Sequence, residues 1–223
     1  MVITIDGAAG VGKTTTAKEL AKELGYQYFD TGAMYRAVTF YFLAEEVNLQ
    51  SSNNINKSLK AMNLQIDFSS GSEMILLLDE KDISLKIRNQ EVTSHVSAVS
   101  ALKEVREMMV SIQRSTTREG NFIVEGRDIG SVVFPDAKYK FYLTADYDIR
   151  AKRRLADFEK INEAKNINII KEDLIVRDKY DSTRKLSPLT KPDGAIVIDT
   201  SECSVEEQVS QILKHIELSL IHI

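Results

Sequence analysis

The sequence predicts an α/β protein whose central parallel sheet is covered by helices on both faces. Three observations lead to this class. The chain opens with a strand, a glycine-rich turn and a helix in that order. Segments of strand composition then alternate with segments of helical periodicity along most of the chain. The length of 223 residues suits one domain, with room for insertions but not for two large domains.

The first thirty residues predict the opening unit of this sheet. Residues 2–5 are a short β-branched run, and a second strand is expected at 26–29. Between them the apolar residues recur at the helical spacing i, i+3, i+4, i+7, in Ala17, Leu20, Ala21 and Leu24. Gly25 is expected to end this helix in a left-handed conformation.

The middle of the chain predicts an insertion into the α/β pattern. A helix is expected around 34–41, and the polar segment 51–57 is interpreted as a break. Residues 64–68 alternate between apolar and polar types, and 74–78 form an apolar run. Because the polar turn 69–73 separates them, the two segments predict a β-hairpin.

The second half returns to alternating elements. A long helix is expected over 102–112, and core strands at 122–124 and 140–143. A helix over 147–158, a last strand at 195–198 and a closing helix over 205–216 complete the prediction.

Composition excludes several classes of protein. The 29 Lys and Arg against 33 Asp and Glu give a net charge of −4, which argues against binding long nucleic acids but not against a small basic pocket. The lone Cys203 cannot form an internal disulfide. No pair of histidines has zinc-ligand spacing, and no role is assigned to His95, His215 or His222. With no membrane-length apolar run and no signal-peptide pattern, a cytoplasmic protein without a membrane partner is expected.

The segment 7–14 matches the phosphate-binding pattern G-x-x-x-x-G-K-[ST] in the required context, after a strand and at the start of a helix. Its backbone N–H groups and the helix N-terminus favour a phosphate. Lys13 is expected to reach the outer phosphates of ATP, and Thr14 to hold Mg²⁺. The expected ATP-binding residues of the loop are Gly7, Ala8, Ala9, Gly10, Val11, Gly12, Lys13, Thr14 and Thr15.

A phosphate loop is compatible with a small-molecule kinase, a GTPase switch or a motor-type ATPase. Residues 190–193 resemble the guanine-reading T-K-x-D motif, but they follow no apolar strand and are interpreted as a Pro-centred turn. Residues 74–80 resemble a Walker B strand that ends in Asp79 and Glu80. Their hairpin context favours an antiparallel strand with an acidic turn instead.

Arginines near the ends of the predicted strands favour the kinase. Arg36 follows the second strand, where Thr31 is expected to cap a helix, and Arg127 follows the strand at 122–124. Arg150, Arg153 and Arg154 share one helical face, as do Arg177, Asp181 and Arg184. Arg150 and Arg154 have a simpler explanation as surface partners of Asp146 and Asp157. Taken together, the set fits phosphoryl transfer, which needs several cations around the donor and acceptor phosphates.

The motifs resemble those of bacterial cytidylate kinases, a family of P-loop nucleoside monophosphate kinases, in order and over nearly the whole chain. The matching segments are Gly7–Thr14, Asp30–Arg36, Arg88–Val92, Glu125–Asp136, Arg177–Arg184 and Ser187–Leu189. The chain differs from the common family pattern at Glu125, where Asp is frequent, and at Tyr180 in the predicted lid.

The resemblance implies transfer of the ATP γ-phosphate to CMP or dCMP, with Mg²⁺ as cofactor, by a monomer. It implies a single P-loop kinase domain over 1–223. Within that domain, it implies a monophosphate-binding region at about 31–100, with the hairpin at 64–78, and a helical lid at about 150–185.

The resemblance also implies roles for individual residues. Catalytic roles fall to Lys13, Arg127, Arg153 and Arg184, and Arg154 joins the ATP site. The CMP site comprises Thr31, Arg36, Ser97, Arg106, Arg127, Asp128, Arg177, Asp181 and Arg184.

Elementary chemistry agrees with a monophosphate acceptor. A CMP phosphate is mostly a dianion at neutral pH and needs no general base, whereas two polyanions need bidentate cations between them. The N4 amino group of cytosine donates to a carboxylate such as Asp128, whereas uracil presents an acceptor there. Two alternatives stay open: a shikimate- or gluconate-type kinase with Asp30 as base, and a P-loop ATPase or GTPase.

Overall fold

A five-stranded parallel sheet forms the centre of the computed structural model, which describes residues 1–68, 74–160 and 163–221. The strand order is β2-β6-β1-β7-β8, and every neighbouring pair is parallel. This confirms the predicted fold class. The strands are β1 (Val2–Gly7), β2 (Gln27–Asp30), β6 (Phe122–Gly126), β7 (Tyr139–Thr144) and β8 (Ile196–Asp199).

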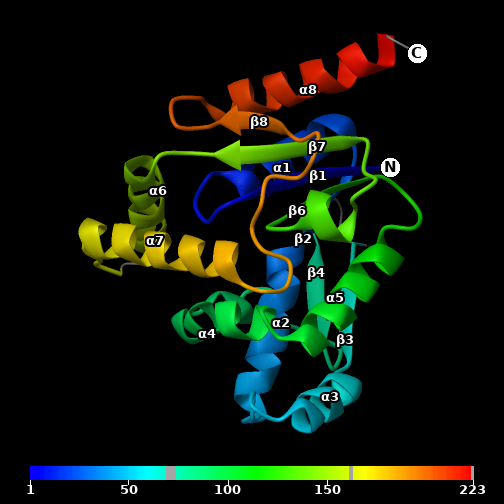
Figure 1. The fold of residues 1–223 in the computed structure, drawn as a ribbon, viewed down its shortest axis with the longest axis vertical. Coiled ribbons are helices and arrows are strands. Elements are labelled where there is room, and N and C mark those ends of the chain that lie inside the picture. Colours follow the sequence, from blue (N-terminus) through cyan, green and yellow to red (C-terminus); the bar gives the residue numbers. More distant parts are fainter. Residues whose placement is uncertain (69–73, 161–162, 222–223) are drawn as a thin grey trace.

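Helices cover both faces of this sheet (Figure 1). On one face, Ile5 and Phe141 pack with α1 (Lys13–Leu24) and α8 (Val205–Ile221). On the other face, Val124 of β6 packs with α2 (Thr31–Ala44) and α5 (Lys103–Thr116). Side chains of successive strand residues point to opposite faces, so β6 contributes Ile123 to the first of these apolar cores and Val124 to the second.

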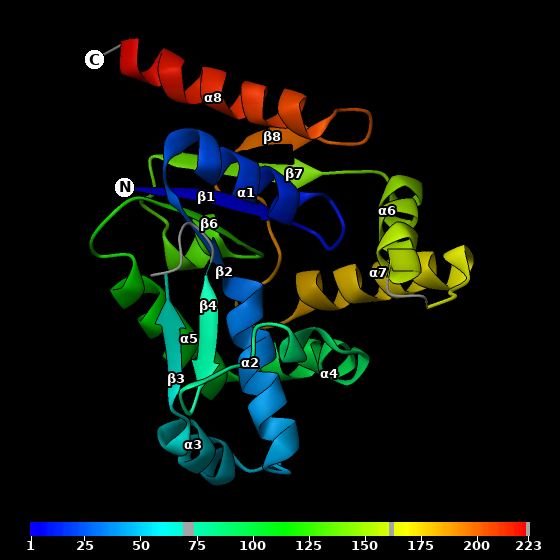
Figure 2. The same cartoon turned by 180° about the vertical axis from the view of Figure 1, so that it is seen from behind.

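A second, antiparallel sheet of three strands lies below the first, beside α2 (Figure 2). It consists of β3 (Leu64–Asp67), β4 (Ile75–Leu78) and β5 (Lys81–Asp82), with Leu64 opposite Leu78. The predicted pairing of the hairpin strands is confirmed, while its turn at 69–73 falls outside the described residues. Because β4 is not part of the parallel sheet, Asp79 at its end does not occupy a Walker B position.

The remaining helices include a pair that projects to one side of the sheet. In Figure 1, α6 (Tyr147–Lys160) and α7 (Ile167–Thr183) form this pair, and Ala151, Ile170 and Leu174 give it a small apolar cluster of its own. The others are α3 (Ser52–Ala61), α4 (Gln90–Ser100), the 3₁₀ turn η1 (Lys86–Arg88) and the π-helical turn η2 (Ile129–Val133).

Two local predictions were wrong. The supposed polar break at 51–57 begins helix α3, where the Ser51 side chain caps the N-terminus and Ile55 and Leu59 bury the inner face. Thr31 is not the N-cap of α2. The carboxylate of Asp30 accepts the Ala33 N–H at 2.9 Å instead. A charged acceptor is at least as good a cap as a hydroxyl, and α2 begins at Thr31 itself, one residue earlier than a Thr31 cap would require.

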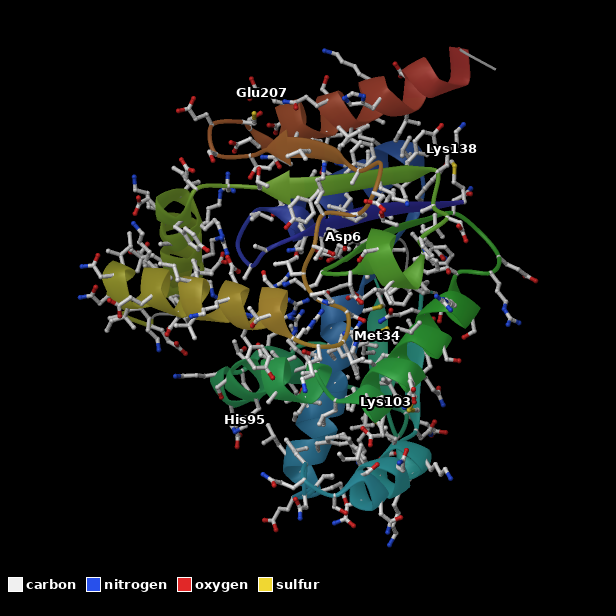
Figure 3. The ribbon with its side chains drawn as sticks, in the orientation of Figure 1. Asp6, Met34, His95, Lys103, Lys138 and Glu207 are labelled. Atoms are coloured by element: carbon white, nitrogen blue, oxygen red, sulfur yellow. The ribbon has the colours of Figure 1, made fainter. Side chains whose placement is uncertain are left out.

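The residues without an assigned role lie outside the central sheet. His95 lies at the outer edge of α4 (Figure 3), and His215 is exposed on α8. His222 falls outside the described residues. Within the described part of the chain, no helix is long and apolar enough to cross a membrane.

Candidate active site

A cleft of about 770 Å³ lies at the carboxyl ends of the parallel strands. The phosphate loop after β1, Asp30 after β2 and the segment 125–128 after β6 all line it. Helices α4, α6 and α7 contribute the other walls. Loops at the carboxyl ends of strands form the binding crevice in open α/β sheets, so the position agrees with the predicted site.

The cleft brings together most of the predicted site residues. Those that line it are Ala9, Gly10, Gly12, Lys13, Thr14, Thr15, Thr31, Arg36, Ser97, Arg106, Arg127, Asp128, Arg153, Arg154, Arg177, Asp181 and Arg184. Gly7, Ala8 and Val11 do not line it. A Cβ on Gly7 would lie 2.4 Å from the Leu143 carbonyl oxygen, and Val11 is buried in the apolar core. Both residues therefore pack the phosphate loop against the sheet and do not face the cleft.

Lys13 lies at the start of α1, and its Nζ donates a hydrogen bond of 2.7 Å to the Ala8 carbonyl oxygen. Gly12 before it adopts φ 96°, a left-handed conformation that glycine reaches without strain. Burial, together with repulsion from the Arg127 guanidinium, lowers the pKa of Lys13 to about 7. A polyanion beside Lys13 would offset that repulsion, so the loop favours a phosphate-rich ligand.

Arg127 lies between the phosphate loop and α7. Its Nη1 donates to the Gly7 carbonyl oxygen at 3.1 Å, and its Nε donates to Asp181 Oδ2 at 3.0 Å. Burial and the nearby Arg127 charge lower the pKa of Arg177 to about 10. The middle of the cleft is therefore strongly cationic.

Asp128, the residue after Arg127, lies between two guanidinium groups. Its Oδ2 accepts from Arg106, and its Oδ1 lies 3.6 Å from Nη2 of Arg184. Arg106 in turn donates from Nε to the Ser187 hydroxyl at 2.9 Å. Burial raises the pKa of Asp128, and the Arg106 and Arg184 charges oppose this rise. The arrangement holds a buried carboxylate at the wall of the cleft.

Both carboxylate oxygens of Asp30 have partners within the protein, which argues against the alternative in which Asp30 is a general base. Its Oδ2 accepts from Arg36 at 2.9 Å and lies 3.5 Å from Arg88, while Oδ1 caps α2 through Ala33. The geometry therefore assigns Asp30 to holding Arg36 and Arg88.

Glu125 and Thr14 form the part of the cleft that fits a divalent cation. The Thr14 hydroxyl donates to Glu125 Oε1 at 2.8 Å, and the Tyr28 hydroxyl donates to the same oxygen. Burial and the nearby Asp30 raise the pKa of Glu125, and Lys13 opposes this rise. Among the described residues no group of three or more His, Cys, Asp or Glu could hold a metal ion. Mg²⁺ in nucleotide sites usually keeps several waters and takes phosphate oxygens of the substrate, so a site with few protein ligands fits this ion.

Asp6, labelled near the centre of Figure 3, fixes the segment that carries Arg127 and Asp128. Its two carboxylate oxygens accept the N–H groups of Ile129 and Gly130, each at 2.7 Å. Burial raises the pKa of Asp6 to about 6, and the two backbone N–H groups limit that rise. Gly126 has no room for a side chain, because a Cβ would lie 2.6 Å from Ile129 and Thr31 atoms.

The arginines of α6 have different surroundings. The proposed surface partner of Arg150, Asp146, was wrong: Arg150 Nη1 pairs with Asp178 Oδ2 of α7 at 2.7 Å, and both side chains are nearly buried. Arg154 does pair with Asp157, at 3.9 Å on the exposed face. Arg153 donates from Nη1 to the hydroxyl of Thr200, the residue after β8, at 3.0 Å, and it lines the cleft together with the phosphate loop.

Sequence reasoning missed Asp6, Tyr28, Arg88 and Asp178 as parts of this site. Asp6 lies in β1 directly before the glycine-rich loop, and Tyr28 lies in β2 two residues before the helix cap Asp30. A polar residue at such a strand position was the available signal in both cases. Arg88 and Asp178 lie inside segments that were singled out for their motifs, but only the folded chain shows their partners.

The comparisons with known proteins identify the family. The family model described as cytidylate kinase matches residues 3–218. The chain belongs to the cytidylate kinase family. The cytidylate kinase of Protochlamydia amoebophila is 43% identical over 219 residues, which cover 96% of each chain. That of Caldanaerobacter subterraneus subsp. tengcongensis is 42% identical over 214 residues, covering 96% of this chain and 93% of the relative.

Family membership confirms the predicted enzyme class, a nucleotide-dependent phosphotransferase. A solved structure from Eubacterium ventriosum, described as an uncharacterized protein, has a TM-score of 0.54 at 13% identity and covers 97% of this chain and 98% of its own. At that identity the similarity shows only that the two chains share a fold.

Proposed function

We propose that the cleft transfers the γ-phosphate of ATP to CMP or dCMP. The observation that carries the proposal is the position of Arg127. Its guanidinium joins the Gly7 carbonyl of the phosphate loop to Asp181 of α7 and so lies between the predicted donor and acceptor sites. A cation at that point offsets the repulsion between two polyanions and the charge that develops in transfer.

In this proposal ATP lies along the phosphate loop, with Lys13 at its outer phosphates and Arg153 and Arg154 on the lid side. The acceptor phosphate lies near Arg36, Arg127 and Arg184. Arg106, Asp128 and Thr31 face the cytosine, and Ser97, Arg177 and Asp181 face the sugar; all of these residues line the one cleft.

The proposed cofactor is Mg²⁺, held by Thr14 and supported by Glu125. When bound, the ion neutralises charge on the phosphate oxygens of the nucleotide. The chain's own contribution is to orient the Thr14 hydroxyl, whose hydrogen bond to Glu125 is 2.8 Å long. Residues 31–100 are proposed as the acceptor-binding region and 150–185 as the lid. The single cysteine agrees with a reducing cytoplasmic compartment, and we propose a monomer without nucleic-acid partners.

A coupled assay of ADP release tests the proposal. CMP, dCMP, UMP, AMP and shikimate are supplied one at a time with MgATP. The proposal expects CMP and dCMP to give kcat/KM at least about tenfold above the others, because one hydrogen bond to a charged group contributes about 1.5 kcal/mol or more. A preference for shikimate would support Asp30 as a base, and equal ATP turnover with every acceptor would indicate an ATPase.

A further inference from the structure

Three side chains from distant parts of the sequence form a continuous chain of contacts beneath the phosphate loop. Tyr28 of β2 donates its hydroxyl hydrogen to Oε1 of Glu125 on β6, and Thr14 of α1 donates to the same oxygen at 2.8 Å. Tyr28 and Glu125 are 4% and 3% exposed. Strands β2 and β6 are direct neighbours, with Asp30 opposite Glu125, so the sheet itself fixes the distance between the phenol and the carboxylate.

The direction of these hydrogen bonds matters for a cation. A threonine hydroxyl has one hydrogen and two lone pairs. Because Thr14 gives its hydrogen to Glu125, the lone pairs of its oxygen remain available on the other side, toward the cleft that Thr14 lines. If Glu125 turned away, the Thr14 hydroxyl could rotate and present its hydrogen to the cation instead.

Tyr28 limits the rotation of Glu125. A glutamate side chain has three rotatable bonds. Its Oε1 accepts one hydrogen bond from α1 and one from β2, and these two bonds together hold the carboxylate in one position. The rest of the tyrosine has a separate role, since its ring packs in the apolar core beneath α1 and lies 5.5 Å from the Lys18 ammonium. The hydroxyl can therefore be removed without removing the ring.

We propose that Tyr28 is a positioning residue for the metal ion: it fixes Glu125, which holds the Thr14 hydroxyl in the orientation that a cation can bind. This inference rests on the proposed Mg²⁺–nucleotide site. It assigns no contact between Tyr28 and the substrate or the metal. Partners that orient a metal ligand typically contribute about 10- to 100-fold in metal affinity.

The test is nucleotide binding, measured by calorimetry with and without Mg²⁺ on the wild type and on Tyr28→Phe. The ratio of the two ADP affinities isolates the contribution of the metal. The proposal expects Tyr28→Phe to lower this ratio by about tenfold and to leave the affinity for metal-free ADP within about twofold of the wild type. Tyr26→Phe, a half-buried tyrosine packed against the same core, is the matched control and should change neither affinity.

A double-mutant cycle tests whether Tyr28 acts on the metal site through Glu125 or only stabilises the fold. Glu125→Gln is expected to lower the same ratio, and adding Tyr28→Phe to Glu125→Gln should then have little further effect. If Tyr28→Phe leaves the ratio unchanged, or lowers both ADP affinities by the same factor, the hydroxyl only stabilises the fold and the inference is wrong. A wild type whose ADP affinity is indifferent to Mg²⁺ also overturns it. This test measures only the binding of ADP and not the phosphorylation of an acceptor. If the proposed preference for CMP fails in the ADP-release assay, the ratio of ADP affinities can still show the effect of Tyr28.

Discussion

Arg150 of α6 and Asp178 of α7 form an ion pair in which Nη1 lies 2.7 Å from Oδ2, with both side chains nearly buried. The same guanidinium donates from Nε to the Ala9 carbonyl oxygen of the phosphate loop at 2.7 Å. A single side chain therefore joins the two helices of the proposed lid to the loop that is expected to hold ATP.

Arg150→Met is expected to destabilise the protein by about 3 kcal/mol or more, because it leaves the buried Asp178 carboxylate without its cation. The KM for ATP should also rise, since the Ala9 carbonyl loses its donor. Chemical denaturation measures the first effect and steady-state kinetics the second. Lys152→Met, an exposed change on the same helix, should shift the free energy of unfolding by less than about 0.5 kcal/mol. Equal stability of the two variants would show that the ion pair contributes little.

Asp128→Asn tests whether this carboxylate distinguishes cytosine from uracil. An amide can turn either an acceptor or a donor toward the base, so the preference for CMP over UMP in kcat/KM is expected to fall by on the order of tenfold. Asp136→Asn changes an exposed carboxylate in the following turn and should leave the preference as it is. An unchanged preference in Asp128→Asn, with the fold intact by thermal unfolding, would exclude the role in base recognition.

Arg127→Ala tests the cation between the two phosphate sites. Its loss should lower kcat by about 100-fold or more, because the transition state carries more charge at that point than bound ATP does. The dissociation constant of ATP should change by less than about threefold. Arg118→Ala, an exposed residue in the turn that follows α5, is the control with no expected effect on either quantity. A loss of ATP affinity as large as the loss of kcat would instead indicate that Arg127 mainly holds the phosphate loop.

Asp6 predicts a particular pH dependence of stability. Its pKa is raised from 3.8 to about 6, mainly by burial, so the folded protein holds this proton more tightly than the unfolded chain does. The contribution of Asp6 is therefore fully present below about pH 4 and is lost as the pH rises through about 6, a change on the order of 3 kcal/mol.

The comparison with Asp6→Asn isolates this group. The variant cannot titrate, and its NH₂ group, unlike a carboxyl oxygen, cannot accept the second of the Ile129 and Gly130 N–H groups, so it should be less stable at low pH. The difference in unfolding free energy between wild type and variant is expected to narrow between pH 4 and pH 7. Denaturation curves over that range measure it, and parallel pH profiles would contradict the assignment.

Sequence reasoning succeeded where the signal was local. The phosphate loop, the strand that precedes it and the helix that follows were predictable because glycine conformation and apolar spacing act within a few residues. The same holds for the hairpin strands at 64–78, which pair antiparallel as expected. Helix α3 carried a usable signal that was overlooked: Ser51 at the cap, with Ile55 and Leu59 four residues apart on the inner face.

The contacts that build the site depend on pairs far apart in the chain. Thr14 and Glu125 are 111 residues apart, and Arg127 and Asp181 are 54 apart. Periodicity cannot indicate such partners, and a simple neighbour rule assigned Arg150 to Asp146 when its partner is Asp178. The roles of the individual cleft residues in substrate binding stay predictions until the variants are measured.

The most direct test of the account is a time course of all nucleotides when the enzyme is mixed with MgATP, with and without CMP. The account predicts CDP and ADP in equal amounts when CMP is present, and almost no ADP when it is absent. The reason is that the proposed lid is expected to close and complete the site only when substrate is bound, and closure then keeps water away from the γ-phosphate. ADP and inorganic phosphate released at the same rate with or without CMP would contradict it.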